Sequence, residues 1–408
     1  MKPQSGSLRQ NIVFISPAWP RPESTGLAMR AYFTAAALAK RHAIHMAVPY
    51  SDGTQWSSHL QRDFARVPQC AIPFSEHVRR FAFARARGLY SRLYATPGDW
   101  TDPASQAPRE FAKRVSAVHP GRLHVFRLYM APFAHAFLGN LRCELDLDES
   151  EARSRRRIAE LARRNGDRKR AELLESEALF YERVEQEWLP RFDRIFAASE
   201  REREYLLDRN PHLTVAVLPN VIALPPSRTA APPRRVARNG PFTMLFVGDF
   251  HHYPNEDAVK YFAEEILPLI KARSADIHVN VVGGGGSHAL RHLRARDPAV
   301  RVLGFVSDLT PLYDAAHAVI VPLRAGGGTR IKILEAFAHG VPVVSTVVGN
   351  EGLASRAEEH LLIGDTPEEF AHACLKLMES PDLGDELSAR AYALVTERYS
   401  TAALEIPD

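Results

Sequence analysis

The residues best suited to chemistry stand together in the segment PLRAGGGTRIKILEAFAHGVPVVST, residues 322–346. Gly326, Gly327 and Gly328 carry no Cβ atoms, so the backbone there can approach a ligand closely. Thr329 is expected to open a helix, and the free N–H groups and positive dipole end of a helix N-terminus favour an anion. The pattern predicts a phosphate-binding turn.

Two cations and a carboxylate follow in the first turns of this helix. Arg330 and Lys332 stand near the positive end of the dipole, which disfavours a cation by roughly 0.3–1 kcal/mol, so we expect a bound anion to compensate them. Glu335 lies on nearly the same face as Lys332, where a carboxylate can accept hydrogen bonds from sugar hydroxyls. Phosphate and sugar together indicate a nucleotide sugar. The alternative, a flexible glycine loop with a surface ion pair, leaves the coincidence of these residue types unexplained.

Apolar runs before and after the segment are expected to be buried parallel strands. The second half of the chain repeats this alternation of apolar strands and helices, which predicts a doubly wound sheet. The expected strands are 243–247, 277–282, 300–305, 318–321 and 341–346.

The first half opens with an expected strand at 11–16, a helix at 27–42 and a second strand at 44–48. The loop 17–26 then lies at the carboxyl end of the first strand, where open parallel sheets bind ligands. Arg30, just inside the helix, is a candidate contact for an anionic group, and a solvated helix residue is the alternative. Further along, the charged stretch 151–188 is interrupted at Asn165–Gly166, which predicts two helices joined by a turn.

At residues 326–346 the chain closely resembles the retaining glycosyltransferases of family 4, also called group 1, which have the GT-B fold. The resemblance continues in the family's order, and it is weaker in the first half, where it rests on NIVFIS (11–16), the turn ending at Gly26, and Arg30. The segments that carry it in the second half are Pro219–Asn220, FVGD (246–249), HYPN (252–255), EILP (265–268), VVGGGG (281–286) and LGFV (303–306).

The resemblance implies an α/β fold of the GT-B class, with two doubly wound Rossmann-like domains facing a central cleft. We expect an acceptor-binding domain at 1–223, a linker at 224–241, and a nucleotide-sugar-binding domain at 242–385. The linker is rich in proline and basic residues without apolar periodicity. The last stretch, 386–408, is expected to form a helix that crosses back to the first domain.

The resemblance also implies roles for single residues. Arg330 and Lys332 would hold the leaving diphosphate and Glu335 the ribose hydroxyls, and these three form the catalytic set. Preorganised cations and N–H groups stabilise the charge that develops on the leaving group. The expected donor-binding residues are Gly248, Asp249, His252, Gly284, Gly285, Phe305, Val306, Gly326, Gly327, Gly328 and Thr329. The expected acceptor-side residues are Gly26, Arg30, Arg127 and His135.

Two departures from the family pattern concern the donor. The family usually has a second glutamate eight positions before Glu335, where this chain has Gly327. The basic pair that often follows the FVG strand is replaced by Asp249, His251 and His252. Neutralising the diphosphate is therefore left to Arg330 and Lys332, and the donor sugar stays open.

The acceptor side is less defined. Arg127 stands near the end of an expected strand at 122–128, and His135 follows it. The family commonly has a functional histidine near such a strand end, but a packed or exposed His135 fits as well. The acidic run 145–150 could hold a metal, although a strand end with a helix cap fits its position better. The resemblance implies no metal and no cofactor beyond the nucleotide-sugar co-substrate.

The amino-acid composition limits the classes of partner and the cellular compartment that fit this chain. The formal charge of +4 is too small to indicate nucleic acid. Three distant cysteines, Cys70, Cys143 and Cys374, fit a reducing cytoplasm, and no run is long enough to span a bilayer. Segment 76–94 interleaves arginines with aromatic residues, which is typical of peripheral membrane contact. A solvated helix with its aromatics in the core is the alternative.

We therefore expect a transferase that moves a sugar from a UDP- or GDP-linked donor to a saccharide, lipid-linked or small-molecule acceptor with retention, in bacterial polysaccharide or glycoconjugate synthesis. An NAD(P)-dependent enzyme is an alternative, because Gly284 to Ala289 fits a weak dinucleotide fingerprint. A non-catalytic nucleotide-sugar-binding protein is another, in view of Gly327.

Overall fold

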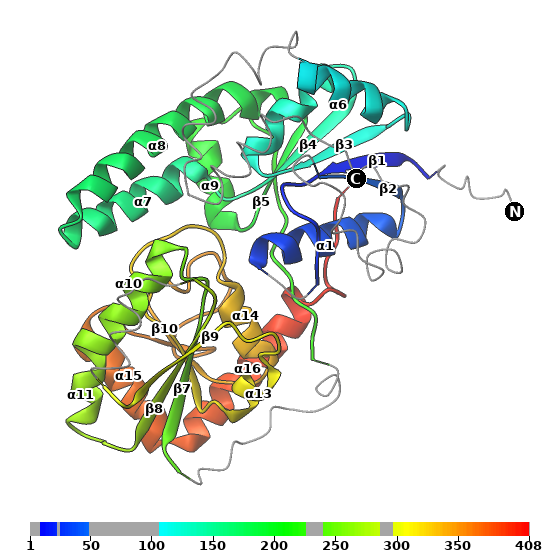
Figure 1. Cartoon of the computed structure of the whole chain (residues 1–408). Coiled ribbons are helices and arrows are strands. Elements are labelled where there is room, and N and C mark those ends of the chain that lie inside the picture. Colours follow the sequence, from blue (N-terminus) through cyan, green and yellow to red (C-terminus); the bar gives the residue numbers. More distant parts are fainter. Residues whose placement is uncertain (1–8, 23–24, 49–105, 226–239, 286–296, 408) are drawn as a thin grey trace, which may run out of the picture. The chain divides into compact units, whose positions relative to one another are not determined.

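The computed structural model describes residues 9–22, 25–48, 106–225, 240–285 and 297–407. The chain forms two compact units (Figure 1). The first comprises Met1–Arg153, Glu175–Pro219 and Glu405–Asp408, and the second comprises Ser154–Leu174 and Asn220–Leu404. Segment 76–94, where we expect membrane contact, and most of the expected linker lie outside the described residues. None of the described helices is long and apolar enough to cross a bilayer.

The first unit is built on a six-stranded parallel sheet with the strand order β2-β1-β3-β4-β5-β6. Its strands are β1 (Asn11–Ile15), β2 (Ala43–Ala47), β3 (Arg122–Phe126), β4 (Arg142–Asp148), β5 (Arg194–Ala197) and β6 (Val215–Val217). The helices in this part of the chain are α1 (Gly26–Ala39), α6 (Gln106–Ser116), α7 (Glu151–Arg164), α8 (Arg168–Trp188) and α9 (Glu200–Arg209), with short turns at η1 (Leu128–Phe137) and η2 (Leu189–Arg191).

The second unit holds another six-stranded parallel sheet, with the order β12-β11-β10-β7-β8-β9. Its strands are β7 (Phe242–Val247), β8 (Ile277–Val282), β9 (Val300–Gly304), β10 (Ala318–Val321), β11 (Val343–Ser345) and β12 (Leu362–Ile363). The helices are α10 (Tyr253–Tyr261), η4 (Phe262–Ile266), α11 (Leu267–Lys271), α13 (Thr310–Ala315), α14 (Ile331–Ala338), α15 (Pro367–Glu379) and α16 (Pro381–Arg398). The predicted pair of doubly wound sheets is confirmed.

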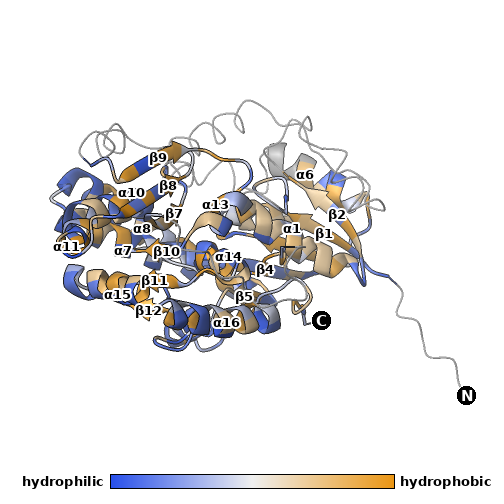
Figure 2. Ribbon diagram, turned by 90° about the horizontal axis from the view of Figure 1, so that it is seen from below, coloured by the Kyte–Doolittle hydropathy of each residue, from blue (hydrophilic) through white to orange (hydrophobic). Residues whose placement is uncertain are grey.

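Buried apolar runs explain why the strands were readable from sequence. In β1, Ile12 to Ile15 are fully buried, as expected for a parallel strand that is covered on both faces. Figure 2 shows the same contrast throughout, with apolar residues concentrated in the strands and polar residues on outer helices such as α11 and α16. The core of each unit therefore lies along its own sheet.

Several element ends follow from local backbone chemistry. The predicted turn between two helices is confirmed: α7 ends at Arg164, and Gly166 adopts a left-handed φ of +77°. Ser150 caps α7 through its hydroxyl, which accepts from the Arg153 N–H at 3.1 Å. The strand expected at 122–128 ends at Phe126, because Arg127 turns to a φ of +75°. The last helix begins at Pro381, earlier than expected, because Ser380 caps it.

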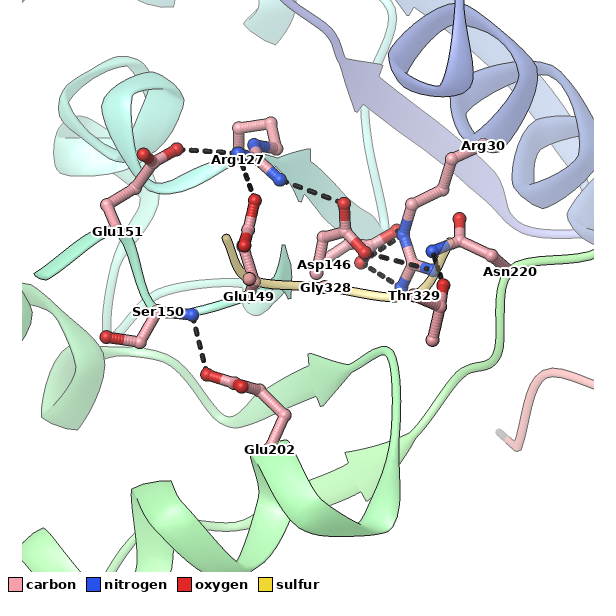
Figure 3. Close-up of polar contacts among 12 residues, drawn as sticks. Arg30, Arg127, Asp146, Glu149, Ser150, Glu151, Glu202, Asn220, Gly328 and Thr329 are labelled. Carbon is pink, nitrogen blue, oxygen red and sulfur yellow. Dashed lines mark hydrogen bonds and ion pairs between the residues drawn. The ribbon is translucent and has the colours of Figure 1, made fainter. Parts of the chain in front are cut away.

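A chain of buried charges crosses the first sheet. Arg30 on α1 is 3% exposed and donates to both carboxylate oxygens of Asp146 on β4, with distances of 2.6–3.1 Å (Figure 3). Arg122 pairs with Glu144 at 2.5 Å. Between these pairs lies His124, 3.8 Å from Glu144 and 3.9 Å from Asp146. The solvated-helix alternative for Arg30 is therefore wrong, because its guanidinium is neutralised inside the unit.

His124 is held by charge as well as by packing. Its ring stacks on Phe14 and Phe196, with centroids 4.9 and 5.7 Å apart. Burial opposes a charged imidazole, but Asp146 and Glu144 outweigh it and raise the pKa of His124. The two carboxylates therefore compensate three buried basic side chains, and each depends on the others to remain buried.

We predict that Asp146→Ala lowers the free energy of unfolding by about 3–5 kcal/mol, because it leaves the Arg30 charge buried without its main partner. Chemical denaturation of the full chain measures the loss. Arg164→Ala is the matched control: it removes an exposed pair with Glu160 and should change stability by less than about 1 kcal/mol. An equal, small effect of both substitutions would contradict the role given to the buried pair.

Candidate functional site

The second sheet places the loop after β7 next to the loop after β10. Strands β7 and β10 are neighbours, while β8 and β9 extend the sheet on one side and β11 and β12 on the other. The chain order reverses between β7 and β10, and such a switch point is where open parallel sheets bind ligands, beyond the carboxyl ends of the strands. The loop after β10 carries the glycines, and the loop after β7 begins at Gly248.

The glycine loop has the conformation that its sequence predicts. Gly326 and Gly328 adopt φ values of +125° and +67°, which side chains rarely tolerate. Arg330 is 8% exposed, and its guanidinium folds back on the loop, donating to the carbonyls of Gly327 and, at 2.7 Å, Gly328. Arg330 therefore stabilises the conformation of the glycine loop that precedes it.

Helix α14 begins at Ile331, two residues later than expected. The left-handed Gly328 and the ψ of 93° at Arg330 keep the backbone out of the helical region until that point. Thr329 is fixed instead by Asn220, whose amide donates to the threonine hydroxyl at 2.6 Å (Figure 3). Lys332 consequently lies in the first helical turn, while Arg330 stands at the N-cap.

Lys332 is held against the loop after β7. Its ammonium donates to Asn255 Oδ1 at 2.8 Å and lies 4.4 Å from the ring centroid of Phe246. A Cβ atom on Gly248 would lie 2.9 Å from Asn255 Cγ and 3.1 Å from the ammonium nitrogen, so a side chain here would displace the Asn255–Lys332 pair. Burial lowers the pKa of Lys332 to about 7; Arg330 acts in the same direction and Glu335 opposes it. A bound anion would favour the charged form.

Glu335 lies one turn beyond Lys332 on α14. The hydroxyl of Tyr313, on α13, donates to Glu335 Oε2 at 2.9 Å. Burial raises the pKa of the Glu335 carboxyl, and Tyr313 and Lys332 counteract that rise. The arrangement leaves Glu335 Oε1 as the carboxylate oxygen that Tyr313 does not engage.

The loop after β7 is ordered by its own polar groups. Asp249 Oδ1 accepts from the His251 backbone N–H at 3.0 Å and lies 2.8 Å from His251 Nδ1, while Asn255 donates to the Asp249 carbonyl at 2.8 Å. Desolvation by the surrounding protein, followed by the charges of Arg330, Arg155 and Lys332, lowers the pKa of His252 to about 4. The site is thus a region of positive potential.

The loop after β8 packs directly on the loop after β7. Phe250 N–H donates to the Gly284 carbonyl at 2.9 Å. A Cβ on Gly283 would lie 1.7 Å from the Gly248 carbonyl oxygen, and one on Gly285 would lie 2.6 Å from the His251 ring. Glycine is therefore required for the two loops to approach. Beside them, Phe305 is 77% exposed and 4.0 Å from the Cβ position of Gly284, and Val306 is half-buried.

In the first unit, two of the four expected acceptor-side residues meet at one carboxylate. Asp148 lies 3.6 Å from Arg30 Nη1 and 2.9 Å from Arg127 Nη1. Arg127 also pairs with Glu151 at 2.6 Å (Figure 3). His135 lies elsewhere, in η1, with its ring edge against Trp188 at 6.0 Å, and Gly26 starts α1 after the cap residue Thr25. Their roles toward an acceptor stay predictions.

We call the glycine loop 326–328 together with Arg330, Lys332 and Glu335 the donor-side group. The sequence analysis did not single out several residues that hold this group in place. Asn255 was visible only as part of HYPN, and Asn220 only as part of a Pro-Asn pair. Tyr313 carried no local signal, because it lies 22 residues from its partner Glu335. The expected set itself is brought together at the second unit's switch point, from Gly248 to Glu335.

A family model and a sequence relative each match part of the chain. Residues 241–380 match the family model described as "Glycosyl transferases group 1". A protein of Klebsiella pneumoniae, described as an uncharacterized 44.6 kDa protein in the cps region, is 24% identical over 165 residues. That match spans 39% of this chain and 42% of the relative.

Solved structures share the whole architecture. Sucrose-phosphate synthase of Thermosynechococcus elongatus superposes with a TM-score of 0.66 at 16% identity, covering 97% of this chain and 96% of that one. Anabaena Alr3699/HepE in complex with UDP and glucose gives 0.63 at 13% identity, with the same coverage. An Escherichia coli trehalose-6-phosphate structure bound with UDP-2-fluoro glucose gives 0.62 at 13%, covering 95% of both chains. The two-unit fold is thereby the GT-B fold.

The pKa of Lys332 gives a test of anion binding. We predict that the affinity for UDP or GDP falls as pH rises through about 7, because an anion binds the ammonium form and neutral Lys332 must first take up a proton. Titration calorimetry between pH 6 and 9 measures this change. In Lys332→Arg the side chain stays charged, so this pH dependence should disappear, whereas identical profiles for the two proteins would show that Lys332 does not face the anion.

Proposed function

We propose that the chain transfers a glycosyl group from a nucleotide-sugar donor to an acceptor, because residues 241–380 match the family model of the group 1 glycosyltransferases. The observation that carries the proposal is the group at the switch point of the second sheet. There a glycine loop with two left-handed residues precedes a half-buried lysine and a half-buried carboxylate on the first turns of one helix. The proposed donor is UDP- or GDP-linked, which the UDP complexes of HepE support.

The proposed catalysis is electrostatic. When the bond between the anomeric carbon and the phosphate oxygen breaks, negative charge develops on the diphosphate. We propose that Lys332, Arg330 and the N–H groups of the glycine loop stabilise this charge. Removing one preorganised donor of this kind typically costs about 3 kcal/mol in the barrier. The positive charges that, after desolvation, lower the pKa of His252 act in the same direction.

We propose transfer with retention of the anomeric configuration. The acceptor hydroxyl oxygen bonds to the anomeric carbon from the face that the leaving group vacates, the carbon–oxygen bond to phosphate breaks, and the acceptor proton passes to the departing phosphate oxygen. No protein nucleophile takes part in this scheme. The residues proposed for the acceptor are those of the first unit, Arg127 foremost.

Gly327 affects which sugar is accepted. The carbonyl of Gly327 accepts from Arg330, so the position where related enzymes usually carry a glutamate offers only backbone here. We propose that the sugar hydroxyls are recognised by backbone N–H groups of residues 326–329. The acceptor is a saccharide, a lipid-linked molecule or a small molecule, in polysaccharide or glycoconjugate synthesis, which the match to a cps-region protein supports. We also propose that the protein is cytoplasmic and that it contacts the membrane through residues 76–94.

The dinucleotide alternative fits the topology less well. Its glycine turn follows β8, which lies one strand away from the switch point between β7 and β10. Dinucleotide-binding turns follow the strand at the switch point itself. The glycines of 283–285 instead allow the loops after β7 and β8 to pack together.

Binding gives the first test. A thermal-shift screen of the full chain against nucleoside diphosphates should raise the unfolding temperature with one base more than with the others, because ligands that bind only the folded state stabilise it. NADH and NADPH serve as controls and should have no effect. Stabilisation by NADH but by no nucleoside diphosphate would support the alternative.

Activity gives the second test. We predict that Lys332→Ala and Glu335→Ala each lower turnover of the nucleotide sugar by about 10²-fold or more, measured by release of the nucleoside diphosphate. Lys376→Ala is the matched control, because this lysine pairs with Glu358 on the surface, and it should retain full activity. Wild-type turnover in both site variants would show that the site lies elsewhere, and stable binding without any turnover in the wild type would indicate a non-catalytic protein.

A further inference from the structure

Tyr313 has an unusual set of contacts for a core residue of the second unit. Its side chain is 1% exposed, and its hydroxyl donates to Glu335 Oε2 at 2.9 Å. Burial, followed by the charge of Glu335 and the hydrogen bond itself, holds the pKa of the Tyr313 phenol well above its usual value. The hydroxyl is therefore a permanent donor toward Glu335.

The ring of Tyr313 is fixed on its other side. His339, directly after α14, stacks on it with centroids 4.6 Å apart and planes inclined by 12°. His339 N–H in turn donates to the Glu335 carbonyl at 2.9 Å, and its Nδ1 lies 3.6 Å from Asp314 on α13. The tyrosine thus joins α13 to the end of α14 through two contacts, its hydrogen bond to the Glu335 side chain and its stacking on His339.

We infer that Tyr313 is a positioning residue, which holds Glu335 Oε2 so that Oε1 is presented to the ribose hydroxyls of the nucleotide. This inference rests on the proposed function. Glu335 extends from a helix surface with three side-chain torsions, and without a partner its carboxylate would sample several rotamers. A buried donor on a neighbouring helix removes that freedom before the ligand arrives, and preorganisation of this kind raises affinity without adding a contact.

The groups around Glu335 distinguish two effects on its carboxylate, which are neutralisation of its charge and control of its orientation. Lys332 stands one turn before it on α14, His339 stacks on the Tyr313 ring, and Asp314 lies 3.6 Å from His339 Nδ1. Lys332 and Tyr313 both favour the ionised carboxylate, but only the tyrosine fixes which oxygen is engaged. Removing the phenol hydroxyl should therefore weaken ribose recognition and also move the ionisation of Glu335 to higher pH.

The experiment compares Tyr313→Phe with the wild type in calorimetric titrations of the full chain. The ligands are the nucleoside diphosphate that the wild type binds best and its 2′,3′-dideoxy analogue. We expect the variant to bind the ribose form about tenfold more weakly and the dideoxy form as well as the wild type does. The fall in affinity on acidification should also begin at a higher pH in the variant.

Controls and contrary outcomes are distinct. Tyr399→Phe removes another buried phenol of the same unit, which accepts from Ala354 N–H at 2.7 Å, and should bind as the wild type does. Equal losses for both ligands in Tyr313→Phe, or no loss at all, would overturn the inference while leaving the proposed function intact. A wild type that binds no nucleoside diphosphate would overturn the proposed function itself.

A double-mutant cycle gives a second test of the coupling between Tyr313 and Glu335. In Glu335→Ala the carboxylate that Tyr313 engages is absent, so adding Tyr313→Phe should cost far less affinity than it does in the wild type, and equal costs in both backgrounds would contradict the coupling. Tyr313→Leu, a second variant without the hydroxyl, is measured alongside. Near-identical losses in Phe and Leu for the ribose form only would support the hydroxyl as the active group.

Discussion

The pairing of β7 with β10 is the constraint on which the donor-side group depends. Ala318 and Val319 lie in register with Met244 and Leu245, so the loops that follow the two strands emerge side by side. This pairing is what allows Lys332, just after one loop, to donate to Asn255, just after the other. If another strand lay between β7 and β10, the chain would still contain the cations and the glycines, but they would not lie close to one another.

Burial then gives the assembled residues their chemistry. An exposed lysine is a permanent, well-hydrated cation, but Lys332 has its pKa lowered to about 7, because the protein around it and Arg330 beside it disfavour its charge. Such a group gains more from a diphosphate than a solvated lysine would, since the anion replaces solvation that folding has already removed. Glycines at 248 and 283 make this possible, because any Cβ there would meet the lysine or the neighbouring backbone.

The first unit uses buried charge in a different way. Arg122, His124 and Arg30 alternate with Glu144 and Asp146 across β3, β4 and α1. The chain of pairs ends at Arg127, whose backbone has a φ of +75°. A non-glycine residue in that region is strained and tends to occur where a side chain is held for a purpose. The carboxylates of Asp148 and Glu151 hold it at the carboxyl edge of the sheet.

The features that depend on local chemistry were predictable from the order of the residues. Apolar runs fixed the strands within a few residues, the glycines marked the loop after β10, and the spacing from Lys332 to Glu335 put both on one helix face. The residue order did not show where α14 begins, because that depends on the ψ of Arg330. Contacts between distant parts of the chain were not predictable in this way: Arg30 is buried on Asp146, 116 residues away, Asn220 binds Thr329, 109 residues away, and Tyr313 binds Glu335. The reason is physical: a side chain's charge state and orientation are set by the groups that surround it, and folding brings those groups from distant parts of the chain.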